Sequence, residues 1–100
     1  MEQNLQDNQD EKPKVKRAIA LEYDPKVDAA PKVVATGRGE IAEKILEIAR
    51  ENKLPIRDDP ILADALAQVD LYDVIPPELY SVVAEVFAFV YRLREKKQNI

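Results

Sequence analysis

The chain has 100 residues, 46% of them hydrophobic, which is enough for one domain with its own hydrophobic core. It contains no cysteine and no histidine, and this excludes disulfides, thiolate metal sites and histidine-based catalysis. The formal net charge of −4 argues against nucleic acid as a partner, because proteins that bind phosphate backbones usually carry a basic face.

The N-terminal stretch 1–14 is polar and charged, and beyond Met1 its only sizeable apolar residue is Leu5. Such a stretch cannot bury enough apolar surface to offset the entropy of ordering, so we expect a disordered tail. The longest apolar run, Val86–Tyr91, is too short to span a bilayer, which predicts a cytoplasmic chain without a transmembrane segment. A single domain over 15–97 and a frayed end over 98–100 complete the predicted organisation.

Two short strands are predicted first. Over 17–23 the large apolar side chains fall at every second position and would share one face of a sheet: Ile19, Leu21 and Tyr23. Pro25 ends this strand, since proline has no N–H for a ladder hydrogen bond. The β-branched run 32–36 predicts a second, buried strand, and Gly37 and Gly39 supply the backbone freedom for a turn into a helix.

A helix is predicted over 40–52, with charged residues on one face. Its apolar residues recur at helical spacing: Ile41, Ile45, Leu46, Ile48 and Ala49. The segment 54–57 is predicted as a third short strand. Because the order strand, helix, strand is that of a βαβ unit, we expect parallel pairing and an α/β fold. The predicted sheet is small, mixed and three- to four-stranded, and about three helices flank it.

Two further helices follow. Asp59 as N-cap and Pro60 in the first turn are typical of a helix start, and this helix runs from Ile61 to about Val69. The longest predicted helix begins at the pair Pro76-Pro77. Its apolar residues recur every three or four positions: Leu79, Val82, Val83, Val86, Phe87, Val90 and Leu93. Its basic end complements the helix dipole or, alternatively, contacts an anionic membrane: Arg92, Arg94, Lys96 and Lys97.

Five segments resemble, in the same order, the cytoplasmic domain of the FlhB/YscU family, the export switch proteins of flagella and injectisomes: 18–25, 29–37, 45–52, 60–66 and 75–91. The motif PILADAL, for example, matches the family pattern Pro-x-Leu-Ala-x-Ala-Leu. The match runs from about Arg17 to Leu93. The resemblance implies a cytoplasmic domain that docks peripherally at the membrane export gate. Its implied partners are export substrates and protein components of the export apparatus.

In the family an Asn-Pro-Thr-His motif precedes the first matching strand, and its asparagine side chain attacks its own carbonyl to break the chain. The four corresponding positions are Pro13, Lys14, Val15 and Lys16. Without an asparagine amide there is no nucleophile, and no Asn-Pro pair occurs anywhere in the chain. We therefore expect a stand-alone, non-cleaving FlhB-like paralogue of the FlhX type, which has no catalytic residues and is not an enzyme.

Family members also carry a short apolar strand before the cleavage motif, after a linker to a membrane domain. The corresponding residues here, 7–12, are too polar for a buried strand. A sheet with the family layout would then be one strand short, with unpaired backbone groups along one edge. That edge could accept a strand from the N-terminal part of a full-length FlhB. Alternatively the chain is a monomer, or the edge pairs with itself in a weak homodimer.

The resemblance places an apolar patch that binds substrates or partners on Ala30, Pro31, Ala84 and Phe87. Ordinary packing is the alternative for Phe87, whose helical spacing suits the core. Ala30 and Pro31 fall in a loop, where burial is not required. The patch is therefore the predicted binding site.

Other candidate sites have simpler explanations. Asp58 and Asp59 could bind a cation, but Asp59 is already accounted for as a helix cap. The glycine-rich turn 37–39 could cradle an anion, but it lacks the remaining residues of a nucleotide-binding loop. The hydroxyl groups of Ser81 and Thr36 have no histidine to activate them. We expect no metal and no cofactor.

Overall fold

The structure, a computed structural model, describes residues 15–98, with side chains as far as Leu93. The predicted tail over 1–14 lies outside the described residues, as do positions 99 and 100 of the predicted frayed end. The elements in chain order are β1 (Arg17–Glu22), β2 (Lys32–Arg38), α2 (Glu40–Glu51), α3 (Pro60–Leu66), the 3-10 turn η1 (Pro77–Leu79) and α4 (Tyr80–Gln98). The mixed α/β class, with its longest helix at the C-terminal end, is confirmed.

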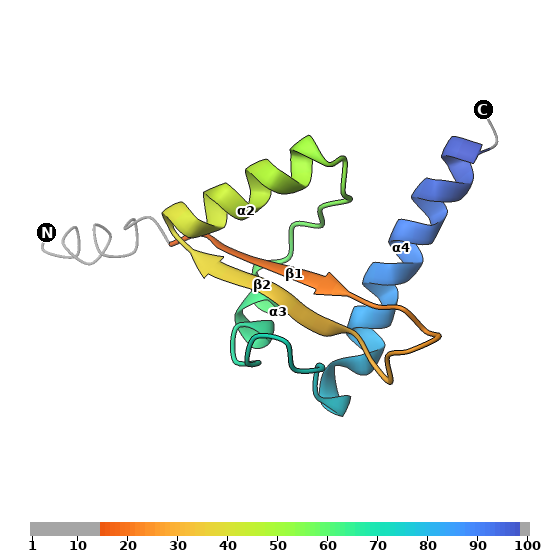
Figure 1. The fold of residues 1–100 in the computed structure, drawn as a ribbon, viewed down its shortest axis with the longest axis horizontal. Helices are drawn as coiled ribbons and strands as arrows, with labels where there is room; N and C mark the ends of the chain where they lie inside the picture. The colour runs from red at the N-terminus through yellow and green to blue at the C-terminus, as the bar shows by residue number, and fades with distance from the viewer. Residues whose placement is uncertain (1–14, 99–100) are drawn as a thin grey trace, which may run out of the picture.

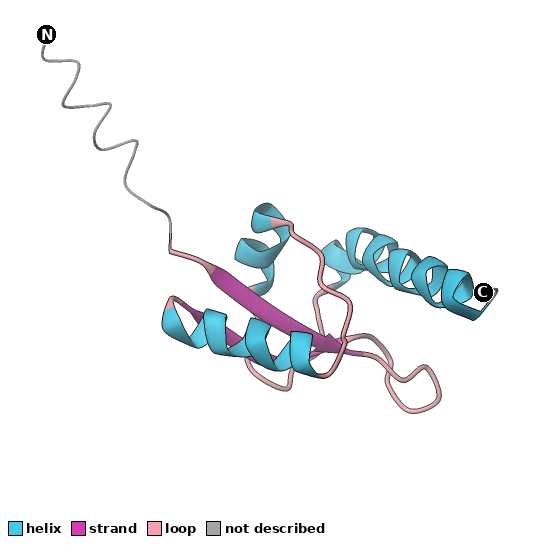
Figure 2. Ribbon diagram, turned by 90° about the horizontal axis from the view of Figure 1, so that it is seen from above, coloured by secondary structure: helices cyan, strands magenta, loops and turns pink. Residues whose placement is uncertain are grey.

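The first two strands form where they were predicted. β1 and β2 pair antiparallel, with Ala18 opposite Gly37 and an irregularity in the register after Ala20. The loop between them turns at Asp24, whose Oδ1 accepts a hydrogen bond from the Lys26 amide at 3.0 Å. α2 lies on one side of this pair of strands and α3 on the other (Figure 1, Figure 2). The sheet is thus the middle layer of the fold.

The predicted third strand over 54–57 and the βαβ unit are wrong. In the part of the chain that the structure describes, the sheet has two strands, and 54–59 is a connection without sheet pairing. Leu54 and Ile56 remain exposed, and Pro55 has no N–H to donate to a neighbouring strand. The alternating pattern of this segment therefore finds no sheet edge and no buried face.

A different segment, the one before η1, lies along the free edge of β2. Its Tyr72 amide donates to the Val33 carbonyl at 2.6 Å, and the Val33 amide donates to the Asp73 carbonyl at 3.0 Å. A third bond joins the Ile75 amide to the Pro31 carbonyl at 2.9 Å. These bonds hold Tyr72 at a φ of 71°, which is unusual for a bulky residue. The edge of β2 is covered by this loop and not by a strand from the predicted βαβ unit.

α2 is confirmed as a helix, and Gly39 allows the chain to enter it. Gly39 has φ 64° and ψ −128°, a backbone conformation that residues other than glycine adopt only at a cost in free energy. Its amide donates to the Lys16 carbonyl at 2.8 Å. Ala42 is the only buried residue of α2, whereas Ile41 and Ile48 are exposed. Part of the predicted apolar stripe of this helix therefore faces solvent.

α3 begins as predicted. The Asp59 carboxylate accepts a hydrogen bond from the Leu62 amide at 3.1 Å, and Pro60 is in the first turn. The helix ends at Leu66, three residues before the predicted Val69, because the chain turns back there toward β2. The N-cap prediction is confirmed and the C-terminal boundary was too long.

The core lies between the sheet, α3 and the first half of α4. Five buried residues form one cluster: Ala30, Leu62, Leu66, Ile75 and Val83. Half-buried side chains pack around it: Ile19, Leu21, Leu79, Val82, Val86 and Phe87. The α4 positions in these sets belong to the predicted apolar stripe. Beyond them α4 runs away from the sheet toward the C-terminus (Figure 1).

Candidate protein-binding surface

Of the four residues predicted to bind a partner, two belong to the core or pack against it: Ala30 and Phe87. Ala30 is only 3% exposed and is itself a core residue, so its side chain is closed to a partner. The Ile75 amide donates a hydrogen bond to the Pro31 carbonyl, and this bond holds the loop that carries Ala30 against the core. Pro31 is half-buried and Ala84 is exposed. Phe87 is half-buried against the core, so packing accounts for only part of its surface.

One face of α4 carries three aromatic side chains around Ala84. Tyr80, Ala84, Phe87 and Tyr91 are spaced by four, three and four residues and therefore share a face, which we call the α4 face. Tyr80 is 46% exposed and Tyr91 is 61% exposed. Phe87 packs against Tyr23, with ring centroids 6.0 Å apart and planes inclined at 58°. The two tyrosines of α4 were not among the predicted site residues, although their spacing from Ala84 and Phe87 was a usable signal.

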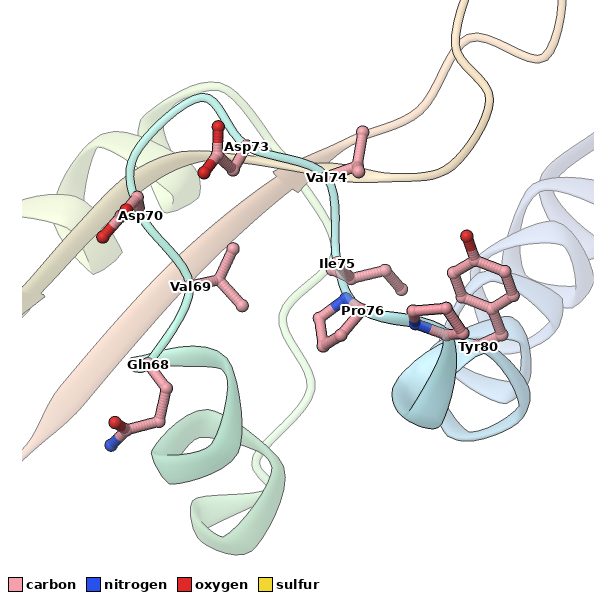
Figure 3. Close-up of a pocket in the computed structure, with 9 residues that line it drawn as sticks. Gln68, Val69, Asp70, Asp73, Val74, Ile75, Pro76 and Tyr80 are labelled. Atoms are coloured by element: carbon pink, nitrogen blue, oxygen red, sulfur yellow. The ribbon is translucent and has the colours of Figure 1, made fainter.

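An open hollow of about 380 Å³ lies at the N-terminal end of the α4 face. Figure 3 shows the loop 68–77 curving from the end of α3 to η1, with Tyr80 beyond it. Val69 and the prolines supply apolar walls, and the acidic residues Asp70 and Asp73 also line the hollow. This site was not predicted from the sequence, because the loop carries no motif and is shaped by its bonds to β2.

Two of the positions that replace the cleavage motif, Val15 and Lys16, are described, and Pro13 and Lys14 lie outside the described range. The Lys16 ammonium lies 2.8 Å from Oε2 of Glu43, near the start of α2. The hydrogen bond and the positive charge of Lys16 lower the pKa of the Glu43 carboxyl. The lysine at the last motif position is therefore engaged with α2.

The remaining candidates do not form a second site. Asp59 caps α3, and the Gly39 amide is bonded to Lys16 and not free for an anion. Ser81 and Thr36 are exposed hydroxyls. Within residues 15–98, no group of three acidic side chains is placed to hold a metal ion. Across the same range, each helix is too short or too polar to cross a bilayer.

The fold of the chain is that of the C-terminal cytoplasmic domains of FlhB-type proteins, as two solved structures show. The cytoplasmic domain of FlhB from Shewanella putrefaciens is 40% identical with a TM-score of 0.80, over 83% of this chain and 65% of that chain. The C-terminal domain of PscU is 27% identical with a TM-score of 0.71, over 74% of this chain and 95% of that chain.

Sequence relatives narrow this class to one family. The Bacillus subtilis (strain 168) protein YlqH is 40% identical over 85 residues, which are 85% of this chain and 91% of that protein. FlhB of Aquifex aeolicus (strain VF5) is 46% identical over 80 residues, 79% of this chain but only 23% of that protein. The model of the FlhB HrpN YscU SpaS family matches residues 15–90, and the chain belongs to this family. The predicted resemblance is confirmed, and it places the chain with the flagellar and type III export apparatus.

Proposed function

We propose that this chain is a protein-binding component of the export apparatus that engages export substrates or gate proteins in the cytoplasm. Pro31 and the α4 face would make the contact, and Ala30 would support them from inside the core. The observation that carries the proposal is the α4 face, with exposed Tyr80, Ala84 and Tyr91 beside the anchored ring of Phe87. Tyrosines on a rigid helix suit a binding surface, because they provide a large contact area with little loss of side-chain freedom.

The proposed role is non-enzymatic, needs no cofactor and involves no self-cleavage. The cleavage reaction needs an asparagine amide that attacks the asparagine's own carbonyl. Positions 13–16 provide no such amide, and the Lys16 side chain is paired with Glu43. The proposed binding surface includes none of these four residues, so its function would not depend on the lost reaction.

The substitution Ala84→Asp tests the proposal. We expect it to weaken binding to purified export-gate cytoplasmic domains and export substrates by about tenfold or more, because a charge in the middle of an apolar contact loses its hydration. Pull-down followed by biolayer interferometry measures the effect. The matched control is Ile61→Asp, which adds the same charge at a position of α3 that is 84% exposed and lies on another element.

Thermal unfolding of both variants establishes that each remains folded. Failure of the unmodified chain to bind any of these proteins would contradict the proposal, as would an equal effect of the two substitutions. Mass spectrometry of the incubated chain should show one species of 11.4 kDa. Two smaller fragments in its place would show that the chain cleaves itself and would contradict this part of the proposal.

The open edge of β1 favours a second candidate function. Among the described residues β1 pairs only with β2, so its other edge has no strand beside it. Unpaired backbone groups along such an edge are a template for an added strand. The chain could thus substitute for the cleaved C-terminal half of a full-length FlhB by accepting the strand that precedes the cleavage site.

A peptide of that FlhB strand tests the second candidate by amide hydrogen exchange. We expect slower exchange at alternate residues of Arg17–Glu22, because only every second amide of an edge strand points outward. A scrambled peptide is the control. If the peptide leaves exchange in β1 unchanged, strand acceptance is excluded. Sedimentation over a range of protein concentrations distinguishes a monomer from a homodimer, in which the same edge would pair with itself.

A further inference from the structure

We propose that the open hollow beside Tyr80 is a subsite for a short extended protein segment that carries one large apolar side chain flanked by lysine or arginine. The inference rests on the proposed function and names the chemistry of the segment that the surface would bind. The occupant is a segment of an exported or gate protein. The arguments are the size of the hollow, its charge, its rigidity and its continuity with the α4 face.

The size and lining of the hollow suit a side chain and not a cofactor. Its volume of about 380 Å³ is near the lower end of the range for ligand sites. Val69, Pro76 and Pro77 give it apolar walls, the buried Ile75 lies behind them, and Tyr80 lines the end nearest the α4 face (Figure 3). A leucine or phenylalanine side chain would bury its apolar surface against these walls.

The negative charge of the hollow favours basic residues next to the apolar side chain of the bound segment. Asp70 and Asp73 line it and are exposed, and none of its nine lining residues is basic. A bound segment without positive charge would desolvate the two carboxylates without pairing them, and an acidic segment would be repelled. A lysine or arginine on either side of the apolar residue would pair with them.

The hollow is held open by the backbone of the loop. The bonds of the Tyr72 amide and the Asp73 carbonyl to Val33, and of the Ile75 amide to Pro31, tie this loop to the start of β2. Binding would therefore require little additional ordering of the wall. Because the last bond ends at Pro31 and Tyr80 belongs to the α4 face, the hollow extends the proposed surface.

Titration of the full, ¹⁵N-labelled chain with three acetylated and amidated heptapeptides tests the subsite by nuclear magnetic resonance. The probes are Gly-Ser-Lys-Leu-Lys-Ser-Gly, its analogue with glutamate for both lysines, and its analogue with glycine for leucine. We expect amide shifts at Val69, Ile75 and Tyr80. At low salt the first peptide should bind about fivefold or more tightly than either analogue.

The double substitution Asp70→Asn with Asp73→Asn should reduce the preference for the lysine peptide over the glutamate peptide to less than about twofold. The control Asp58→Asn, an exposed carboxylate before α3, should leave the preference unchanged. Equal affinity for all three peptides, shifts confined to other surfaces, or no shifts at millimolar peptide would overturn the subsite. The peptide titration does not use any export protein, so the two proposals can fail separately. If export proteins bind but the peptides do not, only the subsite is excluded. If the peptides bind as expected but export proteins do not, only the proposed function is excluded.

Discussion

The substitution Ile75→Ala is expected to lower the free energy of unfolding by about 2–5 kcal/mol, a large share of the stability of a small domain. Ile75 is 1% exposed and packs in the core cluster with residues of α3 and α4. Alanine removes most of this side chain and leaves a cavity where three parts of the chain meet. The backbone bond from residue 75 to Pro31 does not need the side chain, so the loss would come from packing.

Urea unfolding measures this effect as a shift of the midpoint at constant slope. The matched control is Ile61→Ala, which removes the same atoms from a side chain that is 84% exposed and should change stability by less than about 0.5 kcal/mol. Similar midpoints for the two variants would show that the 69–77 loop is not packed as described. The loop also lines the hollow beside Tyr80, so Ile75→Ala should broaden the resonances of Val69 and Tyr80.

The substitution Gly37→Ala is expected to destabilise the domain by about 1–3 kcal/mol, because α2 crosses β2 with no room for another carbon. A Cβ on Gly37 would lie 2.9 Å from the Cβ of Ile41 and 3.3 Å from its backbone carbonyl carbon. Backbone atoms cannot rotate away as a side-chain end can, so α2 must shift from the sheet. Ala42 is the only fully buried residue that α2 contributes, and Ile45, Leu46 and Ala49 are only half-buried.

Hydrogen exchange and urea unfolding together check this prediction. Exchange should accelerate in α2 more than in α3 or α4, because the strain acts where the helix meets β2. The control Thr36→Ala changes the neighbouring, exposed position of the same strand and should cost less than about 1 kcal/mol. The close contact between α2 and β2 would be disproved by a Gly37→Ala protein as stable as the Thr36→Ala protein, with unchanged exchange in α2.

Elements with strong local signals were predicted from the sequence. The alternation around Ile19 and Leu21, the helical spacing over 40–52 and the Asp59 cap each depend on residues a few positions apart. Each of these elements appears in the structure within a few residues of its predicted bounds. The apolar spacing of the last helix likewise predicted which side of α4 enters the core, with Val83 at its centre.

The failures concern long-range pairing. Residues 54–57 have an alternating pattern, yet whether such a segment becomes a strand depends on a free sheet edge, and here the loop before η1 occupies the edge of β2. The same long-range bonds explain why Ala30 is buried, although its position in a loop predicted exposure. Neither outcome is encoded within a window of neighbouring residues.

The sequence by itself determined the family, the local elements, the loss of the cleavage motif at 13–16 and the choice of Pro31, Ala84 and Phe87 as a candidate surface. Only the tertiary structure decided that the described sheet has two antiparallel strands, that Ala30 is a core residue and that Asp70 and Asp73 line a hollow next to Tyr80. The physical reason is that caps and periodicities act over one or two turns of chain. Burial and the edges of a sheet depend on which distant segments meet, as the bonds from Val33 and Pro31 to the 72–75 loop show.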